Sequence, residues 1–368
     1  MNGHTGTRTG TTVYESLAER LRVSIREGRY KPGDLIGSEH QLARQVNISR
    51  MTVRRASELL VREGLLERRP GKGLYVRADN VTTRLIQIVA GNLQWEPSVQ
   101  VSRGVQALAK ARGIQVQLYD AHGDVEQDLT MLRQLPEGPA AGAIIMSLHS
   151  AAFNEAVFRL KAEGFPFVLV DQRLSDIEAP SVMADNYAGG YQVGQSLLKQ
   201  GHRRIAFIGD IAAATVGDRL AGLRDAIADA GLPFDRSLVV ELKEEQNRLG
   251  GWSEEIERAT RDVRGRPEPP TAIFYSCDGV ARPGYRALAA MNLRVPEDIS
   301  VVGFDDDPLA EWLNPPLTTV RQPFSQMGEA AIELLCQRME NPRTPVEHRV
   351  LPAELVQRAS TAAAPDGV

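Results

Sequence analysis

Three arginines share one face of a predicted helix near the N-terminus. The stretch Gln41–Arg55 (QLARQVNISRMTVRR) holds two short helical patterns separated by a polar break. At 100° per residue, the apolar residues of the second pattern fall on one face, and Arg50, Arg54 and Arg55 fall on the opposite face. A guanidinium matches phosphate oxygens and the O6/N7 edge of guanine. The spacing therefore predicts a helix-turn-helix that reads DNA, with a solvated basic face as the alternative.

The neighbouring segments favour DNA binding over a solvated face. Ser49 is a suitable N-cap for the second helix, and Gly64 can end it. Residues 65–76 form two strand patterns around a glycine-bearing turn, which predicts a wing with a basic tip. Residues 1–80 carry 15 Lys and Arg against 9 Asp and Glu, although the net charge of the whole chain is −4. This asymmetry predicts a polyanionic partner for the N-terminal part alone.

The composition is that of a folded protein with two or three domains. The chain has 368 residues, of which 42% are hydrophobic and 24% are charged. No apolar run approaches the roughly 18 residues that span a bilayer, and the N-terminus lacks the apolar core of a signal peptide. We therefore expect a cytoplasmic protein without a membrane partner. Its two cysteines, Cys277 and Cys336, lack metal-ligand spacing, and we expect neither a metal nor another cofactor.

Beyond a short connector at 78–83, apolar strand patterns alternate with helical patterns. Uninterrupted apolar strands joined by helices are typical of parallel sheets covered on both faces. Two successive series predict an α/β body at 84–360 that consists of two doubly wound lobes. The expected ranges are 1–10 for a flexible tail, 11–77 for the DNA-binding head, 84–183 plus 322–344 for the first lobe, 184–321 plus 345–360 for the second lobe, and 361–368 for a second tail.

Polar side chains follow several of the predicted strands. Ligands of doubly wound folds bind beyond the carboxyl ends of the strands. The residues at these ends include Ser147, Asp171, Cys277 and Asp305. Because a carboxylate can accept hydrogen bonds from two vicinal hydroxyl groups, such a set suits a sugar. The indoles of Trp95 and Trp252 lie in polar surroundings and could stack on a sugar ring, although ordinary partial burial is an equal alternative.

The head resembles the winged helix-turn-helix of the GntR regulators. The family pattern is met by Ser38-Glu39, Ser49–Arg54, Glu63–Leu66 and Gly71–Gly73. With Arg55 added from the helix face, the predicted DNA contacts are His40, Ser49, Arg50, Thr52, Arg54, Arg55, Gly71, Lys72 and Gly73. His40 stands where the family usually has an arginine, so its contact would be weaker and dependent on pH.

The body resembles the LacI/GalR effector domain, which has the fold of the periplasmic sugar-binding proteins. The similar segments are VDQR, ADNYAGGYQVGQSLLKQGHRRIAFIGD, GDRLAGLRDAI and VPEDISVVGFDDDPLAEWLNPPLTTVRQP. The resemblance implies ligand contacts by Trp95, Ser98, Asp171, Arg219, Trp252, Cys277 and Asp305. Cys277 is a departure, because many relatives have asparagine there. A GntR head on a LacI-type body is the arrangement of the arabinose-repressor group.

These observations predict a homodimeric, sugar-responsive transcription regulator, most simply a repressor. The expected partners are double-stranded operator DNA, a mono- or disaccharide, and a second copy of the chain. As alternatives at single residues, Arg219 could pair with Asp210 or Asp218, and Asp305 could cap the next segment. The alternative function is an enzyme with a Rossmann-like body, which uses a nucleotide or a sugar. The strand before Gly91 lacks the further glycines of a dinucleotide site, and the chain has neither a nucleophile elbow nor a Walker loop.

Overall fold

The computed structural model describes residues 13–26, 29–62, 64–77, 85–146, 151–174, 176–243 and 252–365, with the side chains at 26, 62, 151 and 252 excepted. The chain divides into two compact units, Met1–Arg84 with the head and Leu85–Val368 with the body. The tail at 1–10, the connector at 78–83 and Ser147 lie outside the described residues, as does the side chain of Trp252. Within the described ranges, no helix is both long and apolar enough to cross a membrane.

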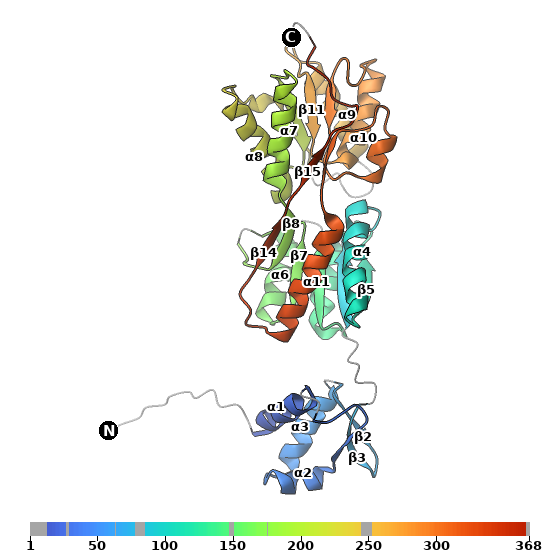
Figure 1. Cartoon of the computed structure of the whole chain (residues 1–368), viewed down its shortest axis with the longest axis vertical. Helices are drawn as coiled ribbons and strands as arrows, with labels where there is room; N and C mark the ends of the chain where they lie inside the picture. Colours follow the sequence, from blue (N-terminus) through green and yellow to red (C-terminus); the bar gives the residue numbers. More distant parts are fainter. Residues whose placement is uncertain are drawn as a thin grey trace, which may run out of the picture. The chain divides into compact units, whose positions relative to one another are not determined.

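The described part of the head combines three helices with a three-stranded antiparallel sheet (Figure 1). Its elements are α1 (Val13–Arg26), β1 (Leu35–Gly37), α2 (Glu39–Gln45), α3 (Arg50–Arg62), β2 (Leu66–Arg69) and β3 (Gly73–Val76), with the strands in the order β1-β3-β2. Apolar residues from these elements, such as Leu17, Leu42 and Leu60, enclose a small core. The predicted helix-turn-helix and wing are confirmed. Strand β1 was not predicted, since three residues give no periodic signal.

The sequence fixes where the two helices of the helix-turn-helix begin. Ser38 and Gln41 form a reciprocal capping box at the start of α2. Between the helices, Asn47 adopts a positive φ of 52°, which asparagine tolerates better than most residues. The hydroxyl of Ser49 accepts a hydrogen bond from the Thr52 amide at 3.1 Å. Ser49 therefore caps α3, as expected.

The first lobe of the body is a six-stranded parallel sheet with helices on both faces (Figure 1). Its strands, in spatial order, are β14 (His348–Leu351), β8 (Ser181–Ala184), β7 (Phe167–Val170), β6 (Gly142–Met146), β4 (Leu85–Ala90) and β5 (Gln115–Asp120). Helices α4 (Glu96–Ala111) and α11 (Phe324–Glu340) share a core with one face, and α5 (Val125–Gln134) and α6 (Ala151–Ala162) share a core with the other. Successive residues of β6 serve opposite cores, as the alternation along a strand requires.

The second lobe repeats this arrangement with a smaller sheet. Its parallel strands lie in the order β10 (Val239–Glu241), β9 (Ile205–Gly209), β11 (Ala272–Tyr275) and β12 (Ser300–Val302). Helices α7 (Asn186–Lys199) and α8 (Ala214–Asp229) cover one face, and α9 (Trp252–Arg264) and α10 (Asp278–Ala290) cover the other. A separate antiparallel pair consists of β13 (Thr319–Arg321) and β15 (Glu354–Val356).

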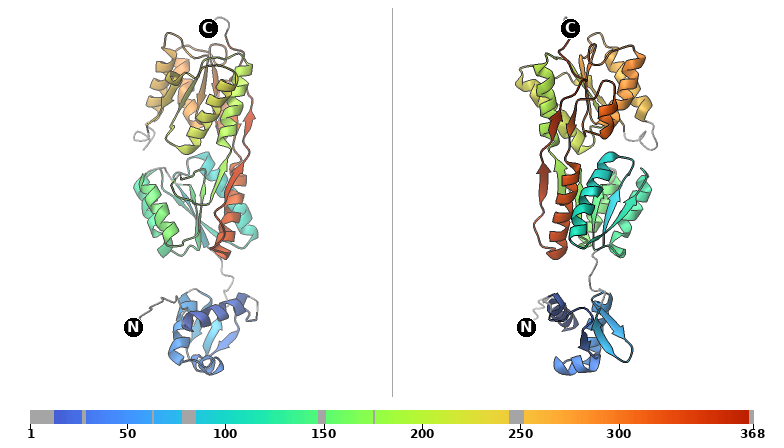
Figure 2. Two further views of the ribbon diagram at one scale, coloured as in Figure 1. Left: turned by 90° about the vertical axis from the view of Figure 1, so that its left-hand side faces the viewer. Right: turned by 45° about the vertical axis from the view of Figure 1, so that its right-hand side comes forward.

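The chain passes between the two lobes three times, after β8, after β13 and after β14 (Figures 1 and 2). The assignment of 345–360 to the second lobe was wrong in part. Strand β14 pairs in parallel with β8 of the first lobe, so only β15 and the residues after it join the second lobe. The sequence pattern of β14 is weak, because it is an edge strand whose residues alternate between exposed and half-buried.

Candidate effector site and DNA interface

The guanidinium of Arg219 is the centre of a buried polar cluster at the strand ends of the body. Arg219 is only 4% exposed. Its Nε donates to Asn186 Oδ1 at 2.8 Å, and its Nη1 donates to the Ser276 carbonyl at 2.5 Å. Nη1 also lies 3.7 Å from Asp305 Oδ1, and the guanidinium covers the Phe304 ring at 3.9 Å. These contacts within the protein therefore fix the orientation of the Arg219 guanidinium.

Two glycines bring helices α7 and α8 close enough to build this cluster. A Cβ on Gly190 would lie 2.1 Å from the carbonyl oxygen of Arg219, and a Cβ on Gly222 would lie 2.2 Å from that of Tyr187. Only residues without a side chain permit such backbone contact. The close crossing places Arg219 of α8 beside Asn186 at the start of α7.

Two carboxylates flank Arg219 from different lobes. Asp171 follows β7 of the first lobe, and Asp305 follows β12 of the second lobe. Burial raises the pKa of Asp171 to about 6 and that of Asp305 to about 7, and in both cases the charge of Arg219 opposes the rise. Asp305 Oδ1 accepts a hydrogen bond from Gln322 Nε2 at 2.7 Å, whereas Asp171 Oδ1 has no hydrogen-bond partner among the described residues.

Cys277 lies in the same cluster, just after β11. Burial is the main reason why the pKa of its thiol rises to about 12, and the charge of Asp305 adds to the rise. The side chain is therefore a neutral thiol at physiological pH, and it is a weak hydrogen-bond donor. The position of Cys277 beside Asp305 is that of a predicted contact residue, and a thiol forms weaker hydrogen bonds than an amide side chain.

Asp278, the next residue, supports the site rather than facing a ligand. It is 1% exposed, and its carboxylate accepts from Thr319 Oγ1 at 2.6 Å and from the Asp307 amide at 2.8 Å. Burial raises its pKa well above the usual value. These bonds hold the loop of Asp305 against β13. The cap of the following segment is Asp307, which accepts from the Leu309 amide, so the capping alternative for Asp305 was wrong.

The remaining ligand candidates lie at the start of α4. Trp95 is the N-cap residue and is 47% exposed, whereas Ser98 is buried. Both follow β4, and β6 lies between β4 and the strand that ends at Asp171. They therefore share one edge of the sheet with Asp171, although within the described part of the chain no hydrogen bond joins them to the Arg219 cluster. Ser147 and the Trp252 side chain lie outside the described residues.

An ion pair joins the two lobes beside the cluster. Arg173 Nη2 of the first lobe donates to Asp218 Oδ1 of α8 at 2.8 Å. Asp218 therefore pairs with Arg173, and the alternative in which it pairs with Arg219 was wrong. Arg173 lies two residues after Asp171, and Asp218 directly precedes Arg219, so this ion pair between the lobes is formed by close sequence neighbours of two cluster residues.

Sequence reasoning missed two residues of the cluster. Asn186 is not among the predicted site residues, but its amide oxygen accepts from Arg219 and orients the guanidinium. Gln322 was interpreted only as a lobe boundary, but it is 3% exposed, bonds Asp305, and has an amide oxygen without a partner among the described residues. The only feature of the sequence that could have indicated these two residues was their position near the points where the chain passes from one lobe to the other.

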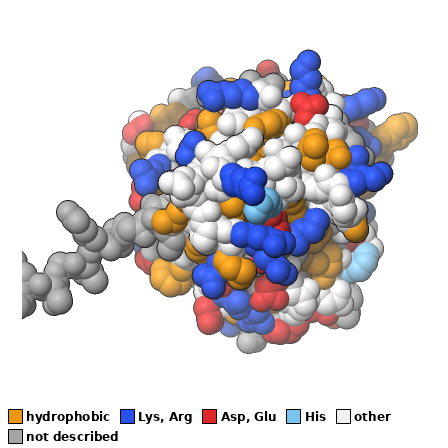
Figure 3. Space-filling view, turned by 90° about the horizontal axis from the view of Figure 1, so that it is seen from below, with side chains coloured by type: hydrophobic (Ala, Val, Ile, Leu, Met, Phe, Trp, Pro, Cys, Tyr) orange, Lys and Arg blue, Asp and Glu red, His pale blue; other side chains and the backbone are white. Residues whose placement is uncertain are grey.

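Lys and Arg side chains gather on the face that Figure 3 shows. Most of the residues predicted to contact DNA are exposed. The side chains of Arg50 and Arg54 are 72% and 52% exposed, and His40, Arg55, Gly71 and Lys72 are also exposed. Arg54 Nε pairs with Glu58 at 3.0 Å on the same helix. Gly73 also permits close packing of the sheet, because a Cβ there would lie 3.0 Å from the Gly37 carbonyl of β1.

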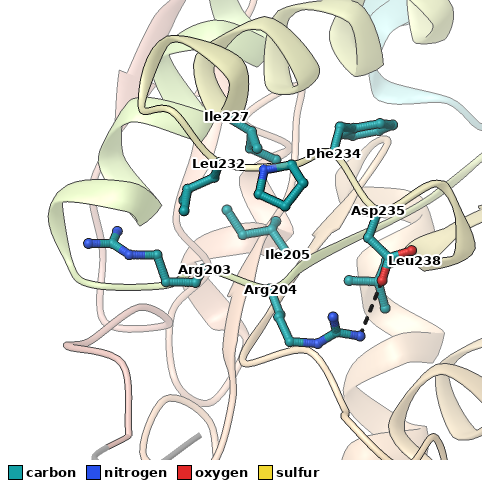
Figure 4. A pocket seen from close by; sticks show the side chains of 9 residues that line it. Arg203, Arg204, Ile205, Ile227, Leu232, Phe234, Asp235 and Leu238 are labelled. Atoms are coloured by element: carbon teal, nitrogen blue, oxygen red, sulfur yellow. Dashed lines mark ion pairs between the residues drawn. The ribbon is translucent and has the colours of Figure 1, made fainter.

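A pocket of about 200 Å³ lies elsewhere, at the amino end of β9 (Figure 4). Its floor is apolar, and the charge of Arg204 is already paired with Asp235 at 3.2 Å. Ligands of doubly wound folds bind at the opposite, carboxyl ends of the strands. The pocket is therefore not the effector site.

Comparison with known proteins matches the head to one family model and part of the body to another. Residues 13–76 match the bacterial regulatory proteins of the gntR family, and residues 195–361 match the periplasmic binding protein-like domain. The arabinose metabolism transcriptional repressor of Geobacillus stearothermophilus is 30% identical over 336 residues, which cover 89% of this chain and 91% of that protein.

Two solved structures with bound sugars are similar to the body. A LacI family transcriptional regulator from Enterococcus faecium with bound ribose has a TM-score of 0.64 and 26% identity, covering 76% of this chain and 100% of that one. The transcriptional regulator CelR in complex with cellobiose has a TM-score of 0.66 and 26% identity, covering 88% of this chain and 99% of that one.

A winged helix-turn-helix joined to a two-lobed body with polar residues at its strand ends defines a ligand-responsive DNA-binding regulator. The chain belongs to the family of transcriptional repressors that combine a GntR-type head with a LacI-type, periplasmic-binding-protein-like body.

Proposed function

We propose that a small neutral sugar binds at the Arg219 cluster and thereby changes the affinity of the head for operator DNA. The observation that carries this proposal is the approach of Asp171, from one lobe, to Arg219 and Asp305, from the other. One guanidinium donor between two carboxylate acceptors matches the donor and acceptor capacity of vicinal hydroxyl groups. An anionic ligand is disfavoured, because both carboxylates would repel it.

The names of relatives narrow the sugars to be tried first. Similar regulators have been solved with ribose and with cellobiose, and a repressor of arabinose metabolism is 30% identical. Pentoses therefore come first in a panel, followed by hexoses and disaccharides. Trp95 and Trp252 would supply stacking surfaces for the ring, and Ser98, Ser147 and Cys277 would supply further polar contacts.

On the DNA side, we propose that α3 enters a major groove and that the wing contacts the neighbouring backbone or groove. The contacts would come from His40, Ser49, Arg50, Thr52, Arg54, Arg55, Gly71, Lys72 and Gly73. One head covers one half-site, so we further propose a homodimer whose heads are spaced by about 34–36 Å or a multiple of that distance. Sedimentation of the full chain at micromolar concentration tests this, and a monomer that still binds a palindromic duplex tightly would contradict it.

The direct test of the effector is the thermal unfolding midpoint of the body in each sugar. At a ligand concentration of 100 times Kd, binding stabilises the folded state by about 2.7 kcal/mol. That corresponds to a rise of roughly 5–10 °C for a domain of this size. A panel in which every sugar leaves the midpoint unchanged at millimolar concentration would contradict a sugar effector.

We propose a binding role and not a catalytic one. A sugar that raises the midpoint should be recovered unchanged after prolonged incubation with the protein. Conversion of the sugar, followed by NMR, would instead favour the enzyme alternative.

A further inference from the structure

Glu39 joins three elements of the head. It lies in the first turn of α2, and its carboxylate accepts from Arg68 Nη2 of β2 at 2.5 Å. Its second oxygen lies 3.7 Å from Arg50 Nε, at the start of α3. The side chain of Glu39 is 14% exposed, whereas those of Arg50 and Arg68 are 72% and 41% exposed. A largely covered carboxylate thus holds two exposed arginines, one on the wing and one on the recognition helix.

The next residue of the wing, Arg69, has a different environment. Successive residues of a strand point to opposite faces, so Arg68 shares the side of buried Leu66 and Arg69 shares the side of Glu67. Arg69 pairs with Glu67 at 2.5 Å, and its guanidinium stacks on Tyr75 at 4.2 Å. The two adjacent arginines have equal charge and nearly equal exposure, but of the two it is Arg68 that bonds α2, through Glu39.

A carboxylate beside a DNA-facing arginine has two opposite effects. It fixes the planar guanidinium in one orientation, so that the remaining N–H donors of Arg68 can meet a base edge with little loss of entropy. It also repels phosphate and offsets one positive charge, which weakens binding to any duplex. Both effects favour discrimination between sequences over affinity for DNA in general.

We propose that Arg68 contacts base edges of the operator beside the recognition helix, and that Glu39 is the positioning residue that orients it. This inference rests on the proposed DNA-binding function of the head. It adds a wing residue and an acidic residue to the set that determines which sequence is bound.

The experiment uses the full-length chain and a duplex that the wild-type chain enriches from a randomised library. Affinities for that duplex and for a scrambled duplex of equal composition are measured for wild type, Arg68→Ala and Arg69→Ala. The first affinity divided by the second is the specificity ratio. We expect Arg68→Ala to lower the specificity ratio by about 10- to 100-fold, the range of one good base contact. Arg69→Ala, the charge-matched control, should change the ratio by less than about threefold.

Glu39→Gln separates positioning from general stabilisation. It removes a negative charge, so we expect affinity for the scrambled duplex to rise while the specificity ratio falls about tenfold. In the Arg68→Ala background, the same change should lower the ratio by less than about threefold, because the hydrogen-bonded arginine is absent and Arg50, at 3.7 Å, is held only weakly. A residue with a merely structural role would lower the melting temperature and leave the ratio unchanged in either background.

Arg68→Lys guards against misfolding of the alanine variant. Lysine keeps the charge but lacks the planar fork, so affinity for scrambled DNA should persist while the ratio falls. The inference would be overturned if Arg68→Ala and Arg69→Ala had equal specificity ratios. It would also be overturned if Glu39→Gln lowered the ratio as much in the Arg68→Ala background as in the wild-type chain. A wild-type chain that enriches no duplex would instead overturn the proposed function itself.

Discussion

Arg219 shows how much of the proposed ligand site is fixed by contacts within the protein. Its Nε and Nη1 are committed to Asn186 and to the Ser276 carbonyl, which orients the guanidinium toward Asp305. A guanidinium can keep these bonds and still offer N–H donors to a ligand. A lysine ammonium at the same position cannot reproduce the fork.

Arg219→Lys should therefore lower sugar affinity by roughly 10- to 150-fold, the cost of about 1.5–3 kcal/mol for a lost charged hydrogen bond. DNA affinity without sugar should stay within about threefold of wild type, because the head is a separate unit. Isothermal calorimetry and a mobility-shift titration measure the two affinities. Arg224→Lys, on the exposed side of the same helix, is the matched control. Unchanged sugar affinity in Arg219→Lys would place the ligand elsewhere.

The pKa values of Asp171 and Asp305 predict how sugar binding depends on pH. Burial raises these pKa values from 3.8 to about 6 and about 7, so the folded body holds protons that the unfolded chain releases. These groups thus make the folded state less stable as pH rises from about 4 to about 7. Sugar hydroxyls donate to ionised carboxylates, so binding should release protons, and affinity should rise between pH 5 and 8.

Calorimetry in buffers of different ionisation enthalpy measures this proton release. Asp305→Asn, which cannot ionise, should flatten the upper part of the pH profile near pH 7. A wild-type affinity that is constant across the range, or that falls as pH rises, would show that the carboxylates do not accept from the ligand.

At this scale, sequence reasoning identifies the residues that end a strand and belong to a distinctive motif. Asp171 and Asp305 are predicted in this way, whereas Arg219 lies within a helix and is implied only by the family resemblance. Asn186 and Gln322 are not predicted, because their roles depend on contacts with Arg219 and Asp305, which lie 33 and 17 residues away along the chain. Polar residues of ordinary type reveal such pairings only when the fold brings them together.

At the scale of elements, the close crossing of α7 and α8 positions the ligand site. Gly190→Ala would place a Cβ 2.1 Å from the Arg219 carbonyl, so the two backbones would have to separate. We expect overpacking to cost about 1–3 kcal/mol and to lower the thermal midpoint of the body by roughly 3–10 °C. Sugar affinity should fall as well, because Arg219 would move with α8.

Gly217→Ala is the control for this substitution. Gly217 lies in α8, the partner helix of this crossing, and a Cβ there would meet its nearest atom at an ordinary 3.5 Å. The variant should be neutral or slightly more stable, because alanine favours helix over glycine by up to about 1 kcal/mol. If calorimetry gives Gly190→Ala and Gly217→Ala the same thermal midpoint, the close crossing of α7 and α8 does not restrict residue 190 to glycine.

The sequence predicts the long elements, whose apolar residues repeat with a clear period. The two series of strands and helices, the recognition helix and the wing all follow from their patterns. Strands β1 and β14 do not, because one has three residues and the other is an exposed edge. The missed edge strand also explains the misplaced lobe boundary, since β14 carries the chain back into the first sheet before its last crossing.

At the scale of the whole molecule, the division of labour follows from charge and composition. The basic head and the acidic body are separate compact units, and the sequence predicts both. The approach of the lobes could not be predicted, because it depends on pairs such as Arg173–Asp218 that join distant segments. If sugar binding changes the affinity of the heads for DNA, DNA binding must change the affinity for the sugar by the same free energy.

The most direct test of this account is a pair of linked titrations with the full-length chain. Affinity for the selected duplex is measured with and without saturating sugar, and affinity for the sugar is measured with and without the duplex. We predict that each ligand changes the affinity of the other by the same factor, about 5- to 150-fold, and that Arg219→Lys abolishes the effect at sugar concentrations too low to saturate that variant. A sugar that demonstrably binds but leaves the affinity for DNA unchanged would contradict the account.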